Sequence, residues 1–259
     1  MPATYLDSIL QHHRERAAND KRSLDDLVAQ ARACVPPRGF ASAIRSTPHL
    51  AVIAEFKRRS PSKGLLNGNM QPDDVARMYQ SGGASCLSVL TDEIHFGGSV
   101  SDLQTARAAC DLPVIRKDFT VDPRDVCDAR IMGADCVLLI AAALSPGELS
   151  DFLAVARTID IDALVEVHDE DELAIALEAG GTLIGVNQRD LVTFSVDHER
   201  AVRMGSAIPD ECVKVAESGV RGRDDALSLR AAGYHAVLVG EHLVTSPHPA
   251  EAVTELCVP

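Results

Sequence analysis

Short apolar runs alternate with segments of helical spacing from about residue 50 to the end of the chain. Each run is bounded by glycine, proline or charged residues, and its length suits a buried strand better than a helix. The pattern predicts eight strands, at 50–56, 84–91, 112–118, 134–141, 162–168, 182–188, 212–218 and 235–241.

The segments between the runs carry the signals of helices. "PDDVARMYQSGG" begins with Pro72 and two aspartates and ends in glycines, and "DEDELAIALEAGG" has a similar acidic start and glycine stop. Eight strand–helix units predict a parallel α/β fold, and the count favours a closed (β/α)8 TIM barrel over an open sheet. The absence of G-x-G-x-x-G and of a P-loop weakens the open-sheet alternative further.

No linker or break in composition divides the chain, so we expect one domain over residues 1–259. Residues 1–48 hold two helical patterns and a Pro-Pro break. We interpret this segment as an N-terminal helical extension that packs on the barrel and, in the simplest case, only covers one of its ends.

The formal net charge is −13, which argues against nucleic acid or an anionic membrane as partner, although a small anion could bind in a local basic pocket. The seven cysteines form no CxxC motif, as expected for free thiols in a reducing compartment. No signal peptide is visible, and the longest apolar run, 136–144, is too short to span a bilayer. We therefore expect a cytoplasmic protein.

Polar residues recur at the carboxyl ends of five predicted strands, where barrel enzymes carry their active sites. They are Glu55, Lys57, Lys117, Glu166, Asn187, Glu217 and Ser218. Any one of them could be a solvated loop residue, but the repetition predicts that they meet at one mouth. Carboxylates and lysines in a partly dry pocket shift each other's pKa values, which suits general acid–base catalysis.

Other kinds of chemistry have weaker support. A Schiff base on Lys57 or Lys117 remains an alternative, because a buried lysine is readily activated. We expect no metal site, because the nine histidines lack ligand spacing and His12 and His13 are expected on a helix surface.

Glycines after the last two strands suggest where an anion would bind. Gly219 and Gly240 would let backbone N–H groups approach a phosphate, although they could also be simple turn residues. Ser60, Lys57 and Arg189 could complete such a site. The stretch "AEFKRRSPSKGLL" adds the basic residues Arg58, Arg59 and Lys63 after Lys57, in a loop suited to closing over a substrate. We expect at least one of the two arginines to face solvent.

Several long motifs resemble the indole-3-glycerol phosphate synthase family: "IAEFKRRSPSKG", "LSVLTDEIHFGGS", "PVIRKDF", "LVEVHDEDEL", "LIGVNQRDLVTFSVD", "VAESGV" and "AVLVGEHL". The resemblance spans nearly the whole chain. It implies a (β/α)8 barrel with an N-terminal helical extension. It also implies conversion of 1-(2-carboxyphenylamino)-1-deoxyribulose 5-phosphate to indole-3-glycerol phosphate, CO2 and water, with no cofactor. We predict no obligatory protein partner.

The resemblance also assigns roles to residues. Lys117 would be the general acid of ring closure, Glu166 would transfer protons, and Lys57 would bind a substrate anion. Glu55, Asn187, Glu217 and Ser218 would hold polar groups of the substrate, Phe96 and Phe119 would line the anthranilate pocket, and Ser60, Gly219, Gly240 and Glu241 would hold the phosphate, supported by Arg189.

The chain departs from the family pattern at Phe56 and Arg59, neither of which removes a catalytic group. Two other functions remain open from the sequence: an isomerase of phosphoribosyl-amines on a related barrel, and a protein that only binds a phosphorylated metabolite.

Overall fold

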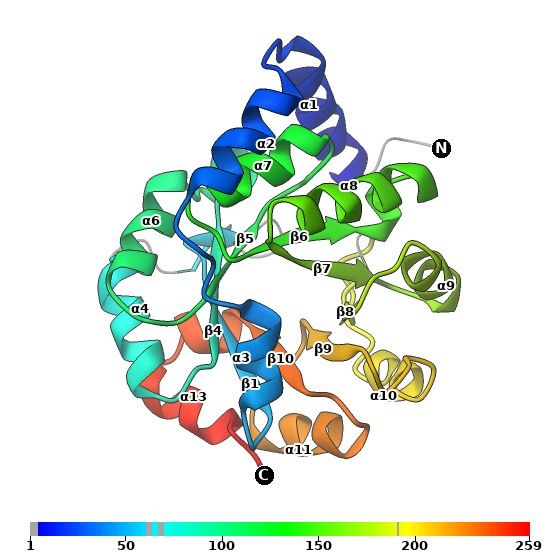
Figure 1. Cartoon of the computed structure of the whole chain (residues 1–259). Helices are drawn as coiled ribbons and strands as arrows, with labels where there is room; N and C mark the ends of the chain where they lie inside the picture. The colour runs from blue at the N-terminus through cyan, green and yellow to red at the C-terminus, as the bar shows by residue number, and fades with distance from the viewer. Residues whose placement is uncertain (1–4, 61–63, 67–69, 191) are drawn as a thin grey trace.

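The computed structural model describes residues 5–60, 64–66, 70–190 and 192–259. Eight parallel strands close into a barrel in which each strand pairs with the next along the chain and the last pairs with the first (Figure 1). They are β1 (Ala51–Phe56), β4 (Cys86–Leu90), β5 (Val114–Lys117), β6 (Cys136–Ile140), β7 (Asp162–Val167), β8 (Leu183–Asn187), β9 (Val213–Glu217) and β10 (Ala236–Val239). The (β/α)8 prediction and all eight predicted strands are confirmed.

Helices surround the barrel and connect its strands (Figure 1). They are α4 (Pro72–Ser81), α5 (Glu93–Phe96), α6 (Val100–Ala108), α7 (Pro123–Ile131), α8 (Pro146–Thr158), α9 (Glu170–Glu178), α10 (Arg200–Met204), α11 (Arg223–Ala231), α12 (Glu241–Val244) and α13 (Pro249–Leu256), with the 3-10 turn η1 (Ala141–Ala143). Local sequence fixes several starts: Asp122 and Ser145 form capping boxes at α7 and α8, each followed by proline. None of the helices in the described ranges is long and apolar enough to cross a membrane.

The N-terminal extension contributes three helices, α1 (Tyr5–Asn19), α2 (Leu24–Ala33) and α3 (Phe40–Ser46), of which the sequence predicted the first two. Helix α2 packs along α7, whereas α3 lies across the barrel (Figure 1). Phe40 and Ile44 of α3 are fully buried against the residues of the barrel interior. The backbone N–H of Ala41 donates to Asp162 at the start of β7, so α3 closes the end of the barrel where the strands begin.

The hydrophobic core has two layers that the strand pleat separates. In β1, Ala51 and Ile53 belong to the interior layer, whereas Val52 and Ala54 belong to the layer between strands and helices. Side chains alternate along a strand, so the next interior position of β1 is Glu55. The same alternation turns the last residues of β5, β8 and β9, and Glu166 of β7, towards the barrel axis at the end opposite α3.

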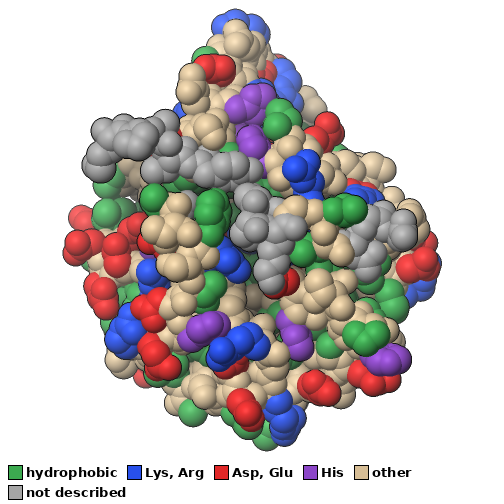
Figure 2. Space-filling model, turned by 180° about the vertical axis from the view of Figure 1, so that it is seen from behind, with side chains coloured by type: hydrophobic (Ala, Val, Ile, Leu, Met, Phe, Trp, Pro, Cys, Tyr) green, Lys and Arg blue, Asp and Glu red, His purple; other side chains and the backbone are tan. Residues whose placement is uncertain are grey.

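A short antiparallel ribbon, β2 (Arg59–Ser60) with β3 (Gly64–Leu65), follows β1 and was not predicted. Arg59 is exposed, as expected for one of the two arginines, while Arg58 pairs with Asp102 of α6, with Nη2 2.9 Å from Oδ1. Lys63, and so part of the proposed closing loop, lies outside the described residues. On the face opposite that of Figure 1, acidic side chains gather towards the edges (Figure 2).

Candidate active site

A cavity of about 550 Å³ opens at the carboxyl ends of the strands. It is lined by thirteen of the fourteen residues singled out from the sequence: Glu55, Lys57, Phe96, Lys117, Phe119, Glu166, Asn187, Arg189, Glu217, Ser218, Gly219, Gly240 and Glu241. The remaining one, Ser60, lies on β2, and its side chain is not among those described. The strand-end pattern thus brings together groups that are up to 186 positions apart, from residue 55 to residue 241.

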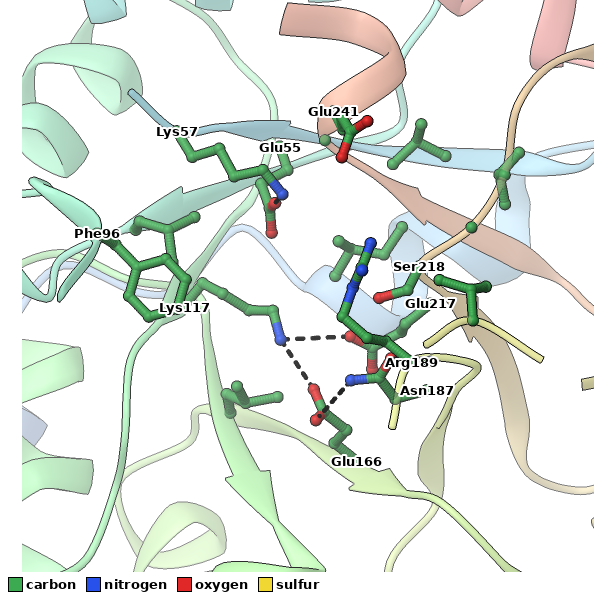
Figure 3. A pocket seen from close by; sticks show the side chains of 18 of the residues that line it. Glu55, Lys57, Phe96, Lys117, Glu166, Asn187, Arg189, Glu217, Ser218 and Glu241 are labelled. Carbon is green, nitrogen blue, oxygen red and sulfur yellow. Dashed lines mark hydrogen bonds and ion pairs between the residues drawn. The ribbon is translucent and has the colours of Figure 1, made fainter. Parts of the chain in front are cut away.

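Lys117 stands at the centre of the polar groups (Figure 3). Its Nζ lies 2.8 Å from Oε2 of Glu166 and 3.4 Å from Oε2 of Glu217. Asn187 donates from Nδ2 to the other oxygen of Glu166 at 2.9 Å. One cation therefore faces two buried carboxylates, and the amide of Asn187 fixes the orientation of one of them.

The two carboxylates respond in opposite ways to this arrangement. Burial by itself raises the pKa of Glu166, but the charge of Lys117, then that of His168, and hydrogen bonds outweigh it, so the pKa is lowered. Burial, followed by repulsion from Glu166, raises the pKa of Glu217. Burial lowers the pKa of Lys117, but the carboxylates of Glu166, Glu217 and Glu55 outweigh it and hold the pKa above its ordinary value. The site therefore holds an ionised carboxylate beside one that binds a proton readily, which is typical of acid–base machinery.

Glu55 and Lys57 form a second pair on the opposite wall of the cavity (Figure 3). Lys57 Nζ lies 2.7 Å from Glu55 Oε1, and the Ser88 hydroxyl donates to Glu55 Oε2 at 3.3 Å. Gly240 faces this pair: a Cβ at that position would overlap Glu55 Oε1 and lie 2.8 Å from Lys57 Nζ. Position 240 therefore requires glycine to leave room for the ion pair, a steric requirement that the sequence analysis did not identify. Gly185 on β8 leaves room for Glu217 in the same way.

The cavity wall formed by the segments after β8, β9 and β10 combines glycines with cationic side chains. Ser218 and Gly219 both have positive φ, at 66° and 76°, and a Cβ on Gly219 would lie 2.5 Å from Val196. Helix α12 begins directly after Gly240. The cavity lining here also includes His198, Arg221 and His242, none of which the sequence singled out. Arg189 donates to the carbonyl of Phe194 at 3.0 Å and so supports this wall.

The apolar side of the cavity is built partly by the N-terminal extension. The rings of Phe96 and Phe119 lie 6.3 Å apart, and Leu6 and Ile9 of α1 line the same cavity. The extension thus contributes to the cavity wall, and the expectation that it only covers one end of the barrel is wrong. Contacts of α1 with residues 79 or more positions further along the chain leave no signal in local sequence.

His13 is also placed differently from the prediction. His12 is exposed, but His13 is buried, with Nε2 3.1 Å from Oδ2 of Asp92, and its ring lies 5.5 Å from that of Phe119. His95 Nδ1 lies 3.0 Å from the same oxygen, while Asp92 Oδ1 caps α5. The position is buried because α1 packs on the barrel mouth.

The side chains of His13, Asp92 and His95 lie close enough together to hold a metal ion, and both residue types bind zinc in proteins. Both histidines contact Asp92, whose carboxylate is already oriented by the start of α5. The absence of a metal from the chemistry stays a prediction.

A closed barrel whose mouth gathers lysines, carboxylates, an apolar wall and a glycine-lined cationic wall defines an acid–base enzyme for a small, partly aromatic anion. The sequence profile described as indole-3-glycerol phosphate synthase matches residues 6–256. The chain is 51% identical to indole-3-glycerol phosphate synthase 2 of Streptomyces coelicolor over 95% of this chain and 94% of that one. It is 46% identical to the indole-3-glycerol phosphate synthase of Mycolicibacterium smegmatis, over 98% and 94%.

Solved structures agree on the fold alone. A thiamine phosphate pyrophosphorylase from Pyrococcus furiosus superposes with a TM-score of 0.59 at 17% identity, covering 80% of this chain and 93% of that one. An N-acetylmannosamine-6-phosphate 2-epimerase from Clostridium perfringens gives 0.60 at 13% identity, over 77% and 89%.

The chain belongs to the indole-3-glycerol phosphate synthase family. Its activity is that of a carboxy-lyase of tryptophan biosynthesis, and its substrate is a phosphorylated small molecule.

Proposed function

We propose that Lys117 is the general acid of this reaction and that Glu166 is its proton-transfer partner. Closing the indole ring turns the substrate's carbonyl oxygen into a hydroxyl, which requires a proton; loss of CO2 and then of water completes the product. The observation that carries the proposal is the Lys117 ammonium held 2.8 Å from Glu166 in the cavity. A lysine between two carboxylates is charged, and so has a proton to give.

The other groups complete the proposal. Lys57 binds an anionic group of the substrate, and Glu55 holds Lys57 in place through their 2.7 Å contact. Asn187 orients Glu166, and Glu217 with Ser218 contacts the hydroxyls. Phe96 and Phe119 enclose the anthranilate ring. Gly219, Gly240, Glu241 and Ser60 hold the phosphate, with Arg189 supporting the wall.

We also propose that residues 1–259 act as one domain in the cytoplasm, without a cofactor or a second protein. The support is that one chain supplies the acid–base groups, the apolar wall and the cationic wall, and that α1 of the extension lines the same cavity as the barrel strands.

The test compares Lys117→Met and Glu166→Gln with the wild type, following indole fluorescence and absorbance with the carboxyphenylamino-deoxyribulose phosphate. Each variant should lose about 10²-fold or more in kcat, because a positioned acid or base contributes about 10²–10⁴. Gln30→Met, which places the same methionine at an exposed position of α2, is a control that should retain activity. A Lys117→Met enzyme with wild-type kcat would remove Lys117 from the role of acid.

A further inference from the structure

His168 lies immediately behind Glu166, outside the cavity lining, and the mechanism above gives it no role. It follows the end of β7, and its side chain is only 11% exposed. Its Nδ1 lies 3.0 Å from Oε2 of Glu172 on α9, and the same oxygen accepts the backbone N–H of His168 at 2.8 Å. Glu172 therefore fixes both the ring and the backbone of His168.

The other ring nitrogen points towards the active site. Nε2 of His168 lies 3.6 Å from Oε1 of Glu166, which is too long for a hydrogen bond but within ion-pair range. This Nε2 is buried and has no hydrogen-bond partner among the described residues. The imidazole thus stands between two carboxylates, one on each side of the ring.

This geometry selects one charge state. A neutral ring protonated on Nδ1 would set the Nε2 lone pair against Glu166, and one protonated on Nε2 would set the Nδ1 lone pair against Glu172. Only the imidazolium gives each carboxylate an N–H. Burial lowers the pKa of His168, but Glu172 and Glu166, followed by Glu217 on β9, outweigh it and raise the pKa. Lys117 on β5 donates to the other oxygen of Glu166.

We propose that His168, held by Glu172, is a positioning residue of the reaction: an imidazolium that keeps the Glu166 carboxylate ionised and aimed at the cavity. The proposal rests on the role of Glu166 stated above. When Lys117 gives its proton to the substrate, Glu166 loses its cation on Oε2. His168 keeps positive charge on the side of Oε1, so Glu166 remains a base for the later proton transfers.

The first test needs no turnover. Side-chain nitrogen NMR of the histidine-labelled wild-type enzyme, with His168 assigned through His168→Asn, should show an imidazolium at neutral pH. Its pKa should fall by about one unit or more in Glu172→Gln and in Glu166→Gln, because an opposite charge at this distance shifts a pKa by about 1–3 units. A neutral His168 at pH 7 in the wild type would overturn the proposal, whatever the kinetics of the variants.

The second test is the pH profile. His168→Asn should move the acidic limb of kcat/KM upward by about one pH unit or more, since Glu166 would then bind a proton more readily. His248→Asn is the matched control, because His248 is exposed and its acidic neighbour, Glu251, lies 4.0 Å away at the surface. An unchanged profile in His168→Asn, alongside an inactive Glu166→Gln, would refute the role of His168 alone. An active Glu166→Gln would instead refute the proposed role of Glu166.

Discussion

Gly240→Ala isolates the steric role that the structure gives this glycine. Gly240 has φ −116° and ψ −69°, so alanine meets no left-handed strain there. The added Cβ would overlap Glu55 Oε1 and lie 2.8 Å from Lys57 Nζ. Ordinary carbon contacts are about 3.5–4.0 Å, so the carboxylate must retreat by about 1 Å.

Glu55 has little room for that movement, because it is 4% exposed and its second oxygen accepts from Ser88. Overpacking of this kind costs about 1–3 kcal/mol of stability. A displacement of about 1 Å in a catalytic site can cost about 10²-fold in rate. We therefore expect Gly240→Ala to fold, with a lowered melting temperature, and to lose about 10²-fold in kcat.

The assay is steady-state kinetics with kcat and KM separated, beside a thermal melt. Gly147→Ala on α8 makes the same chemical change where a Cβ would meet nothing within 4 Å, and it should keep wild-type kinetics. A Gly240→Ala enzyme with unchanged kcat and a raised KM would refute the reasoning, since the glycine would then serve only the approach of the phosphate.

Two further predictions concern binding and pH. Inorganic phosphate should compete with the substrate and stabilise the protein, by about 2.7 kcal/mol at about 100 times its Kd; if a melting curve does not shift at millimolar phosphate, the anion site is misplaced. The raised pKa of Glu217 means that the folded state binds the proton of this carboxyl group more tightly than the unfolded state does. The stabilisation from the bound proton is complete at low pH and is lost as pH rises above the ordinary carboxyl pKa of about 4.3. Glu217→Gln should therefore gain melting temperature over the wild type at about pH 9 and gain less at about pH 5, and an equal gain at both would contradict the assignment of the shift.

Strand ends could be predicted from the sequence because two local signals coincide there. Apolar runs locate the strands, and the alternation from Ile53 to Glu55, or from Val215 to Glu217, sets which side chain enters the barrel. The same parity links Ile115 to Lys117 and Leu164 to Glu166. These positions needed no knowledge of long-range packing beyond closure of the barrel.

Other features depend on contacts that local sequence does not record. The burial of His13 and the place of Ile9 in the cavity wall follow from the docking of α1. Predicting that a side chain at position 240 would overlap Glu55 requires the positions of two strands to within about 1 Å. The ribbon of β2 with β3 is too short to produce a periodic pattern.

The most direct test of the account is turnover by the purified wild-type protein. With the carboxyphenylamino-deoxyribulose phosphate as sole substrate and no added cofactor, indole fluorescence and released CO2 should rise together and in equal amounts. Tight binding of the same compound without either product would contradict the account, and would leave a phosphorylated-metabolite binder on this barrel.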